Sequence, residues 1–148
     1  MAKPYEHCAT NLNASDIPLA LYVHLPWCER KCPYCDFNSH EQFDSSLETG
    51  YIHALLTDLR QQLVSVGSRP LFSVFLGGGT PSLFSGASIA RLLSGIDQIW
   101  SISPTTEITM EANPGSAEAS RFADYRSAGV NRLSLGIQSF ADEQLTAL

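Results

Sequence analysis

Short apolar runs alternate with amphipathic segments along most of the chain. Residues 19–25 form the first apolar run and predict a strand, and in residues 45–63 a leucine or tyrosine recurs at every fourth position, which predicts a helix. Ser45 and Glu48 have the spacing of a capping box at the start of that helix. The same alternation predicts strands at 71–76, 107–111 and 131–137, and helices at 89–100, at 116–128 (ended by Gly129) and from about 139.

Four strand–helix units in a row predict a parallel sheet with right-handed crossovers. Parallel strands are usually apolar on both faces. Here Glu107, Thr109 and Glu111 alternate with Ile108 and Met110, and the strand at 131–137 alternates in the same way. One face of the sheet is therefore polar and the other is covered by helices. We expect an α/β fold, a partial (β/α) barrel with about four βα units, whose polar interior holds a ligand.

The side chains that could bind a ligand or a metal lie where the predicted strands end. In barrels of this type the functional groups lie at the C-terminal ends of the strands. Tyr22 and His24 lie there before a cysteine-containing loop, residues 77–81 follow the second strand, residues 111–114 the third, and Gln138 ends the fourth. Four segments that are distant in sequence are thus expected to meet at one end of the sheet.

Three of the four cysteines fall within eight residues, in the order CxxxCxxC: Cys28, Cys32 and Cys35. Such crowding is typical of metal binding, and thiolates favour iron–sulfur clusters or zinc. A structural zinc ion requires four ligands, and His40 could complete a Cys3His set. A zinc-binding structural module therefore stays open as an alternative, whereas Cys8 is expected to be a free thiol without a role.

The charge and hydropathy of the chain exclude some partners. The 148 residues carry a net charge of -6, whereas binding to a phosphate backbone needs clustered cations, so no nucleic-acid partner is expected. The apolar stretch at 17–25 is too short to cross a bilayer and no basic segment precedes it, which predicts no transmembrane segment and no secretory signal. We expect a cytoplasmic location.

The sequence at the cysteines resembles a known family. Residues 22–28, Tyr-Val-His-Leu-Pro-Trp-Cys, run into the other two cysteines as in the radical S-adenosylmethionine (SAM) superfamily. More narrowly, they are similar to the oxygen-independent coproporphyrinogen III oxidase family and its HemW-type heme chaperones. The resemblance continues through GGGTP at 77–81, EANPG at 111–115 and NRLSLGIQSF at 131–140, and it covers the chain from residue 19 to the end.

The resemblance implies a 4Fe-4S cluster held by the three cysteines, with a fourth iron that chelates SAM. It assigns Gly78, Gly79 and Thr80 to the methionine end of SAM. It assigns Glu111 to the ribose hydroxyls, a role that a carboxylate can fill by accepting two hydrogen bonds. The residues themselves leave alternatives open: a tight turn for the glycines, and for Glu111 an ion pair with Arg132 inside the barrel.

Three further side chains are SAM contacts by the same resemblance. Gln138 and Tyr22 are expected beside SAM or the cluster, and Tyr34 over the adenine. A buried structural amide, a core tyrosine and a loop-packing aromatic are the respective alternatives. We expect His24 to be a structural histidine rather than a ligand.

The resemblance implies a radical SAM protein of heme metabolism, most like the heme chaperones that transfer heme to acceptor proteins. Its partners would be SAM, heme or a porphyrin, heme-accepting proteins and an electron donor. The alternative is an enzyme, the oxygen-independent coproporphyrinogen III oxidase of porphyrin biosynthesis. The oxidases carry a further cysteine where this chain has Phe37.

The expected organisation is a mobile N-terminal segment at 1–18 and the N-terminal part of a radical SAM core at 19–148. Members of this superfamily typically build the barrel from six units, and the final predicted helix has barely begun at Leu148. We therefore expect residues 19–148 to be the front part of a longer core domain.

Overall fold

The computed structural model describes residues 13–115 and 119–147. Its single sheet contains four parallel strands in the order β1 (Leu19–Leu25), β2 (Leu71–Gly78), β3 (Ile102–Ala112) and β4 (Arg132–Leu135). The helices are α1 (Glu48–Val66), α2 (Gly86–Ile99), α4 (Phe122–Ala128) and α5 (Asp142–Thr146), with short 3-10 helices at Ala14–Asp16, Ser45–Leu47 and Pro81–Leu83. The predicted α/β arrangement of four βα units is confirmed.

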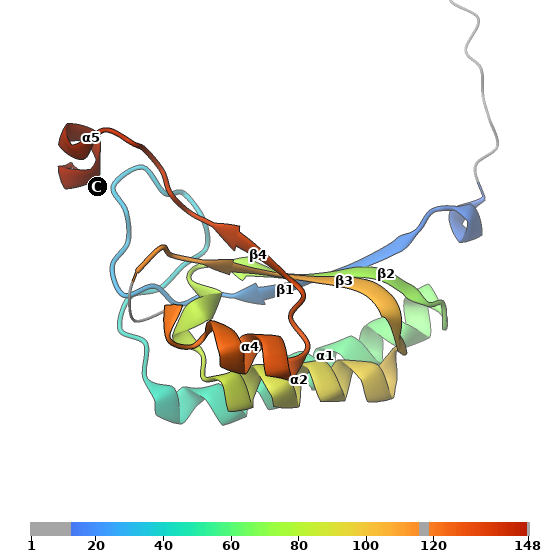
Figure 1. Ribbon diagram of the computed structural model, residues 1–148. Coiled ribbons are helices and arrows are strands. Elements are labelled where there is room, and N and C mark those ends of the chain that lie inside the picture. Colours follow the sequence, from blue (N-terminus) through green and yellow to red (C-terminus); the bar gives the residue numbers. More distant parts are fainter. Residues whose placement is uncertain (1–12, 116–118, 148) are drawn as a thin grey trace, which may run out of the picture.

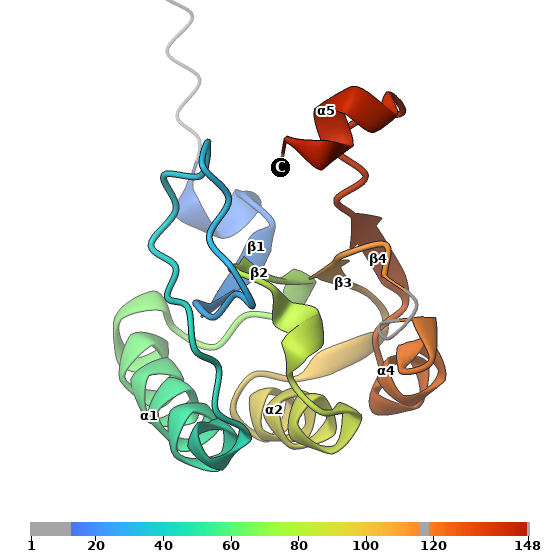
Figure 2. The same ribbon diagram turned by 90° about the vertical axis from the view of Figure 1, so that its left-hand side faces the viewer.

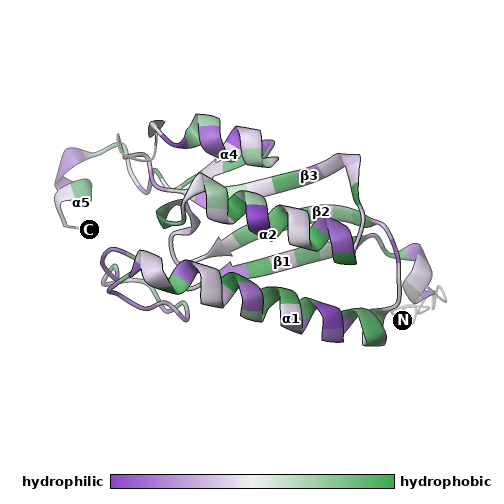
Figure 3. Cartoon of the chain, turned by 90° about the horizontal axis from the view of Figure 1, so that it is seen from below, coloured by the Kyte–Doolittle hydropathy of each residue, from purple (hydrophilic) through white to green (hydrophobic). Residues whose placement is uncertain are grey.

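The sheet has one covered face and one open face. Helices α1, α2 and α4 lie side by side under the sheet, while α5 lies beyond the end of β4 (Figures 1 and 2). Seen from the helical side, α1 and α2 run along the strands (Figure 3). Val74, Leu76, Ile108 and Met110 point into the interface with the helices and are buried. The predicted arrangement is therefore confirmed: the apolar face of the sheet packs on the helices, and the polar face borders an open interior.

The start of the first long helix differs from the prediction. Asp44, rather than Ser45, caps the preceding 3-10 turn by accepting a hydrogen bond from the Ser46 N–H at 2.8 Å, and this bond is the main cause of the lowered pKa of Asp44. The Glu48 carboxylate is buried and accepts a hydrogen bond from the Ser85 hydroxyl at 2.7 Å. The predicted capping box is wrong, because Glu48 joins α1 to the N-cap of α2 instead.

The later elements are shorter than predicted. Within the described residues α4 begins at Phe122, and residues 116–118 of the predicted helix lie outside the described part of the chain. Gly129 does end α4, with a φ of 116° in the left-handed region that glycine adopts easily. Strand β4 ends at Leu135, so the residues that follow it form a loop.

The register between β3 and β4 determines which side chains form the ion pair on the open face of the sheet. In the β3–β4 ladder Arg132 lies opposite Thr109, and Ser134 lies opposite Glu111. Arg132 therefore reaches Glu107, with an N–O distance of 3.3 Å, and also donates to the Thr109 hydroxyl at 3.3 Å. Glu107 therefore has a structural role on the polar face, and the alternative of a Glu111–Arg132 ion pair is wrong.

Tyr125 fixes the segment that follows β2. It is fully buried, and its hydroxyl donates to the Ser82 and Phe84 carbonyls, at 2.8 and 3.0 Å. Tyr125→Phe should lower the free energy of unfolding by about 1–2 kcal/mol, because two buried carbonyls lose a shared donor. Urea unfolding followed by circular dichroism would measure this loss, and a variant as stable as the unchanged chain would contradict it.

None of the helices in the described ranges combines the length and the apolar character that crossing a bilayer requires.

Candidate functional site

The loop after β1 carries the three cysteines and is tied back to the strand. The Cys28 N–H donates to the His40 carbonyl at 2.9 Å, and the His40 N–H donates to the Pro26 carbonyl at 2.7 Å. A parallel bridge between Trp27 and His40 results. These bonds pin both ends of the cysteine loop, while a turn bond from the Cys35 N–H to the Cys32 carbonyl shapes its middle.

The glycine segment after β2 is pressed against the start of this loop. The Gly79 N–H donates to the Leu25 carbonyl at 2.8 Å, and the Thr80 N–H donates to the Trp27 carbonyl at 2.7 Å. A Cβ on Gly79 would lie 2.5 Å from the Trp27 oxygen, which leaves no space for a side chain. The GGGT sequence is therefore needed for this close approach of two backbones.

Below the cysteine loop lies a cluster of aromatic side chains. The Trp27 ring contacts the rings of Phe43, Tyr51 and Phe84 with centroid distances of 6.0, 4.6 and 5.7 Å. Phe84 is fully buried, and the Tyr51 hydroxyl donates to the His24 carbonyl at 2.9 Å. Trp27 therefore anchors the loop on the core and does not line the cavity above it.

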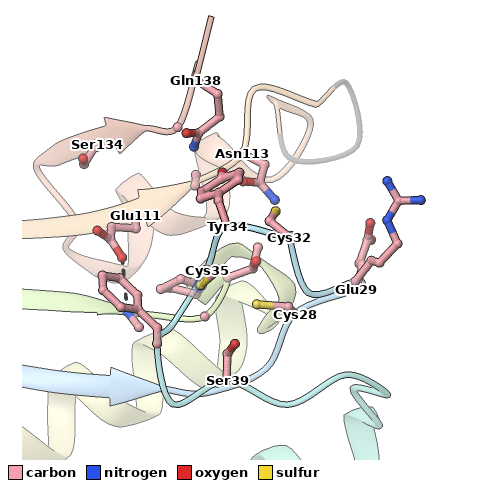
Figure 4. Close-up of a pocket in the computed structure, with 18 residues that line it drawn as sticks. Cys28, Glu29, Cys32, Tyr34, Cys35, Ser39, Glu111, Asn113, Ser134 and Gln138 are labelled. Carbon is pink, nitrogen blue, oxygen red and sulfur yellow. Dashed lines mark hydrogen bonds between the residues drawn. The ribbon is translucent and has the colours of Figure 1, made fainter. Parts of the chain in front are cut away.

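A cavity of about 490 Å³ opens between the cysteine loop and the strand ends. Its lining consists of parts of the cysteine loop, including all three cysteines, together with residues 78–81, residues 111–113, Ser134, Gly136 and Gln138. Figure 4 shows the cysteine sulfur atoms along the cysteine loop, with Glu111 and Gln138 reaching toward this space from the strand ends. The four predicted segments thus meet at one end of the sheet.

Glu111 contacts the glycine segment of the neighbouring strand. Its Oε2 accepts a hydrogen bond from the Gly78 N–H at 3.1 Å, the dashed contact in Figure 4. Gly78 has a φ of 118°, and a Cβ there would lie 2.6 Å from the His24 ring. The second carboxylate oxygen accepts no hydrogen bond from the described residues. The carboxylate can therefore hold the glycine turn with one oxygen and accept from a ligand with the other.

Gln138 lies in the loop after β4 rather than at the end of the strand. Its φ is 62°, in the left-handed region that residues other than glycine seldom adopt. Its side chain amide turns back over Gly136, where a Cβ would lie 3.0 Å from Nε2. Unusual backbone geometry of this kind is common at ligand sites.

Tyr34 lies between two of the cysteines and lines the cavity. A hydrogen bond with Cys32 is the main cause of the raised pKa of Tyr34, to which partial burial and the charges of Cys32 and Cys35 add. The direction of this shift favours the protonated phenol, which can donate a hydrogen bond.

Tyr22 is the predicted site residue that the structure leaves outside the cavity lining. Its ring stacks on Phe75 with a centroid distance of 6.1 Å, and its hydroxyl lies 3.3 Å from His24 Nδ1. Burial, and then the charge of Glu111, raise the pKa of Tyr22. His24 is held on its other side by the Asn38 carbonyl, 2.8 Å from Nε2, as expected for a structural histidine.

Comparison with known proteins identifies the family. A family model of the radical SAM superfamily matches residues 22–148.

The chain belongs to the radical SAM superfamily.

Similar proteins narrow the relationship. The chain is 54% identical over 135 residues to heme chaperone HemW of Haemophilus influenzae and 50% identical over 131 residues to that of Escherichia coli, and each alignment covers 88% of this chain and 35% of the relative. Among solved structures, coproporphyrinogen III oxidase (HemN) from Escherichia coli superimposes with a TM-score of 0.74 at 31% identity, over 85% of this chain and 29% of that one. The chain spans about a third of the curated relatives it matches.

Radical SAM proteins hold an iron–sulfur cluster, and the donor set here can be tested against that group. Among the described residues, no three histidine, cysteine or acidic side chains lie close enough together to hold one metal ion. A zinc ion needs each of its donor atoms at about 2.0–2.3 Å from the ion, so the donors must converge on one point. Each thiolate of a four-iron cluster binds a separate iron, so three thiols that line one cavity without converging on a single point fit a cluster better than they fit zinc. His40, the fourth ligand in the zinc alternative, does not line the cavity.

Several residues that line the cavity were not assigned a contact from the sequence. Asn113 and Ser134 line the cavity opposite the cysteines, and Ser39 and Arg30 line it within the loop. Asn113 belongs to the predicted segment 111–114 and Ser134 to the predicted polar face of its strand, but the sequence assigned neither of them a contact. Ser39 carried no such signal, because its position depends on how the loop folds back.

Proposed function

We propose that this chain forms the cluster- and SAM-binding part of a heme chaperone, a protein that binds heme and transfers it to acceptor proteins. The observation that carries the proposal is the shared cavity, in which three thiols face the polar strand ends. The names of the relatives, heme chaperones at 50% and 54% identity, support the heme-related role. Because the chain spans about a third of those relatives, the heme site and the acceptor contacts are proposed for the whole protein.

The three cysteine thiolates are proposed to bind three irons of a 4Fe-4S cluster. When bound, the cluster supplies an electron that can break a sulfonium carbon bond of SAM. The backbone of Gly78, Gly79 and Thr80 would lie against the methionine end of SAM, since no side chain blocks its approach there. Glu111 would accept hydrogen bonds from the ribose, and Gln138 would close the opposite side.

Different observations support the proposed roles of Tyr34 and Tyr22. Tyr34 lines the cavity and is proposed to cover the adenine with its ring. Tyr22 is proposed to act at the edge of the site, because its hydroxyl lies beside His24, whose ring packs under Gly78. An electron donor and heme-accepting proteins complete the proposed set of partners.

The second candidate is the oxygen-independent coproporphyrinogen III oxidase, favoured by the similarity to HemN. Phe37 is the residue that leads us to favour the chaperone over the oxidase. This residue is 57% exposed and lines the cavity at the position where the oxidases carry a further cysteine. A phenylalanine ring can neither bind metal nor relay a proton, and it instead gives the cavity an apolar edge.

The test compares heme binding with decarboxylation in the full-length protein. We expect saturable heme binding in a spectroscopic titration, and no conversion of coproporphyrinogen III to protoporphyrinogen IX in an anaerobic assay with cluster, SAM and a chemical reductant. The Cys28→Ala variant is the control, because it separates cluster-dependent turnover from background oxidation. Multiple cluster-dependent turnovers would favour the oxidase, and absence of heme binding would refute the chaperone.

A further inference from the structure

Ser39 presents a buried hydroxyl without a partner in the wall of the cavity. The residue is 8% exposed, and its Oγ makes no hydrogen bond with any described residue. Ser39 lines the cavity together with Cys28 and Cys35, and Figure 4 shows its hydroxyl pointing toward the sulfur atoms of these two residues. The hydroxyl oxygen itself has almost no exposed surface.

The backbone on both sides of Ser39 is fixed to β1 and its extension. The Asn38 carbonyl lies 2.8 Å from His24 Nε2, and the His40 N–H donates to the Pro26 carbonyl at 2.7 Å. The Ser39 N–H itself donates to the Phe37 carbonyl at 2.8 Å. The backbone position of Ser39 is therefore fixed by the same bridge that holds Cys28, which keeps its side chain in the cavity wall.

An unpaired buried hydroxyl is unfavourable, and native proteins rarely keep one without a reason. Ser82 and Trp100 also carry unpaired buried groups within the described residues, but neither lines this cavity. At Ser39 the available acceptors are the anionic sulfur atoms that a bound cluster would place in the cavity. A hydroxyl donor suits these atoms because thiolates and sulfides carry negative charge and no proton.

We propose that Ser39 donates a hydrogen bond to a sulfur atom of the iron–sulfur cluster and thereby raises the reduction potential of the cluster. Reduction adds one electron and makes the cluster more negative, so a donor to sulfur stabilises the reduced state more than the oxidised state. The inference rests on the cluster of the proposed function but not on heme binding.

The test is a redox titration of the reconstituted protein, with electron paramagnetic resonance of the reduced cluster as the readout. Ser39→Ala should bind as much iron and sulfide as the unchanged protein. Its equilibrium constant for reduction should fall about three- to tenfold, and a tenfold fall is about 59 mV for one electron. Ser39→Thr, which keeps the hydroxyl, should retain most of the original potential.

Ser82→Ala is the matched control, because it removes a hydroxyl that is equally buried and unpaired but lies outside the cavity. It should leave the potential unchanged. A potential in Ser39→Ala equal to that of the unchanged protein, or a shift of the same size in Ser82→Ala, would overturn the role of Ser39 while leaving the proposed function intact. An unchanged protein that assembles no cluster would overturn both.

Discussion

Replacing Cys28, Cys32 or Cys35 by alanine is expected to remove most of the bound iron. Each thiolate is proposed to hold one iron of the cluster, and these three are the free cysteines of the described residues. No other thiol lies in the loop, and the loop ends are pinned by the Trp27–His40 bridge, so a distant donor cannot replace a missing ligand. Iron and sulfide analysis after anaerobic reconstitution, together with visible absorption, would measure the loss.

Cys8→Ala is the control for this prediction. Cys8 lies outside the described residues, and it is expected to be a free thiol without a role. Its replacement should leave iron and sulfide content unchanged, and an equal loss of iron would show that the ligand assignment is wrong. Colourless protein that retains one zinc ion would instead support the zinc alternative, since zinc gives no visible absorption.

The positions of the functional segments could be predicted because a parallel sheet brings the ends of its strands together. Strand-like runs, helical spacing and the polar alternation of residues 107–111 located the open face and the end of the sheet that carries the candidate site. The structure places nine of the ten predicted site residues around one cavity, and the exception, Tyr22, stacks on Phe75 beside it.

The contacts that the sequence did not reveal are all tertiary. Glu48 has the spacing of a capping box, but its carboxylate bonds to Ser85, which is 37 residues away. Arg132 was an alternative partner for Glu111, yet strand register brings it to Glu107. Ser39 enters the cavity wall only because the loop folds back on β1. Local spacing cannot encode a partner that depends on register or on the path of a loop.

Glu111→Ala is expected to weaken SAM binding by about 1.5–3 kcal/mol, or roughly 10- to 150-fold in affinity. The structure adds a second consequence. Because Glu111 accepts from the Gly78 N–H, alanine also leaves that buried N–H without a partner and frees the glycine turn. Isothermal titration calorimetry with SAM would measure affinity, and iron content should stay unchanged because no cysteine ligand is touched.

Glu111→Gln separates the two roles of this carboxylate. Glutamine keeps a carbonyl oxygen that can accept from Gly78 but loses the negative charge, so it should preserve thermal stability and weaken SAM binding by about 0.5–1.5 kcal/mol, the scale of a neutral hydrogen bond. Glu107→Ala is the control on the same face, since it removes the ion pair with Arg132 and the hydrogen bond from the Thr109 hydroxyl, lies outside the cavity lining and should leave SAM affinity unchanged. Equal SAM affinities in the unchanged protein and in Glu111→Ala would refute the ribose role. Equal losses of affinity in Glu107→Ala and Glu111→Ala would show that the effect comes from the polar face as a whole and not from a contact between Glu111 and SAM.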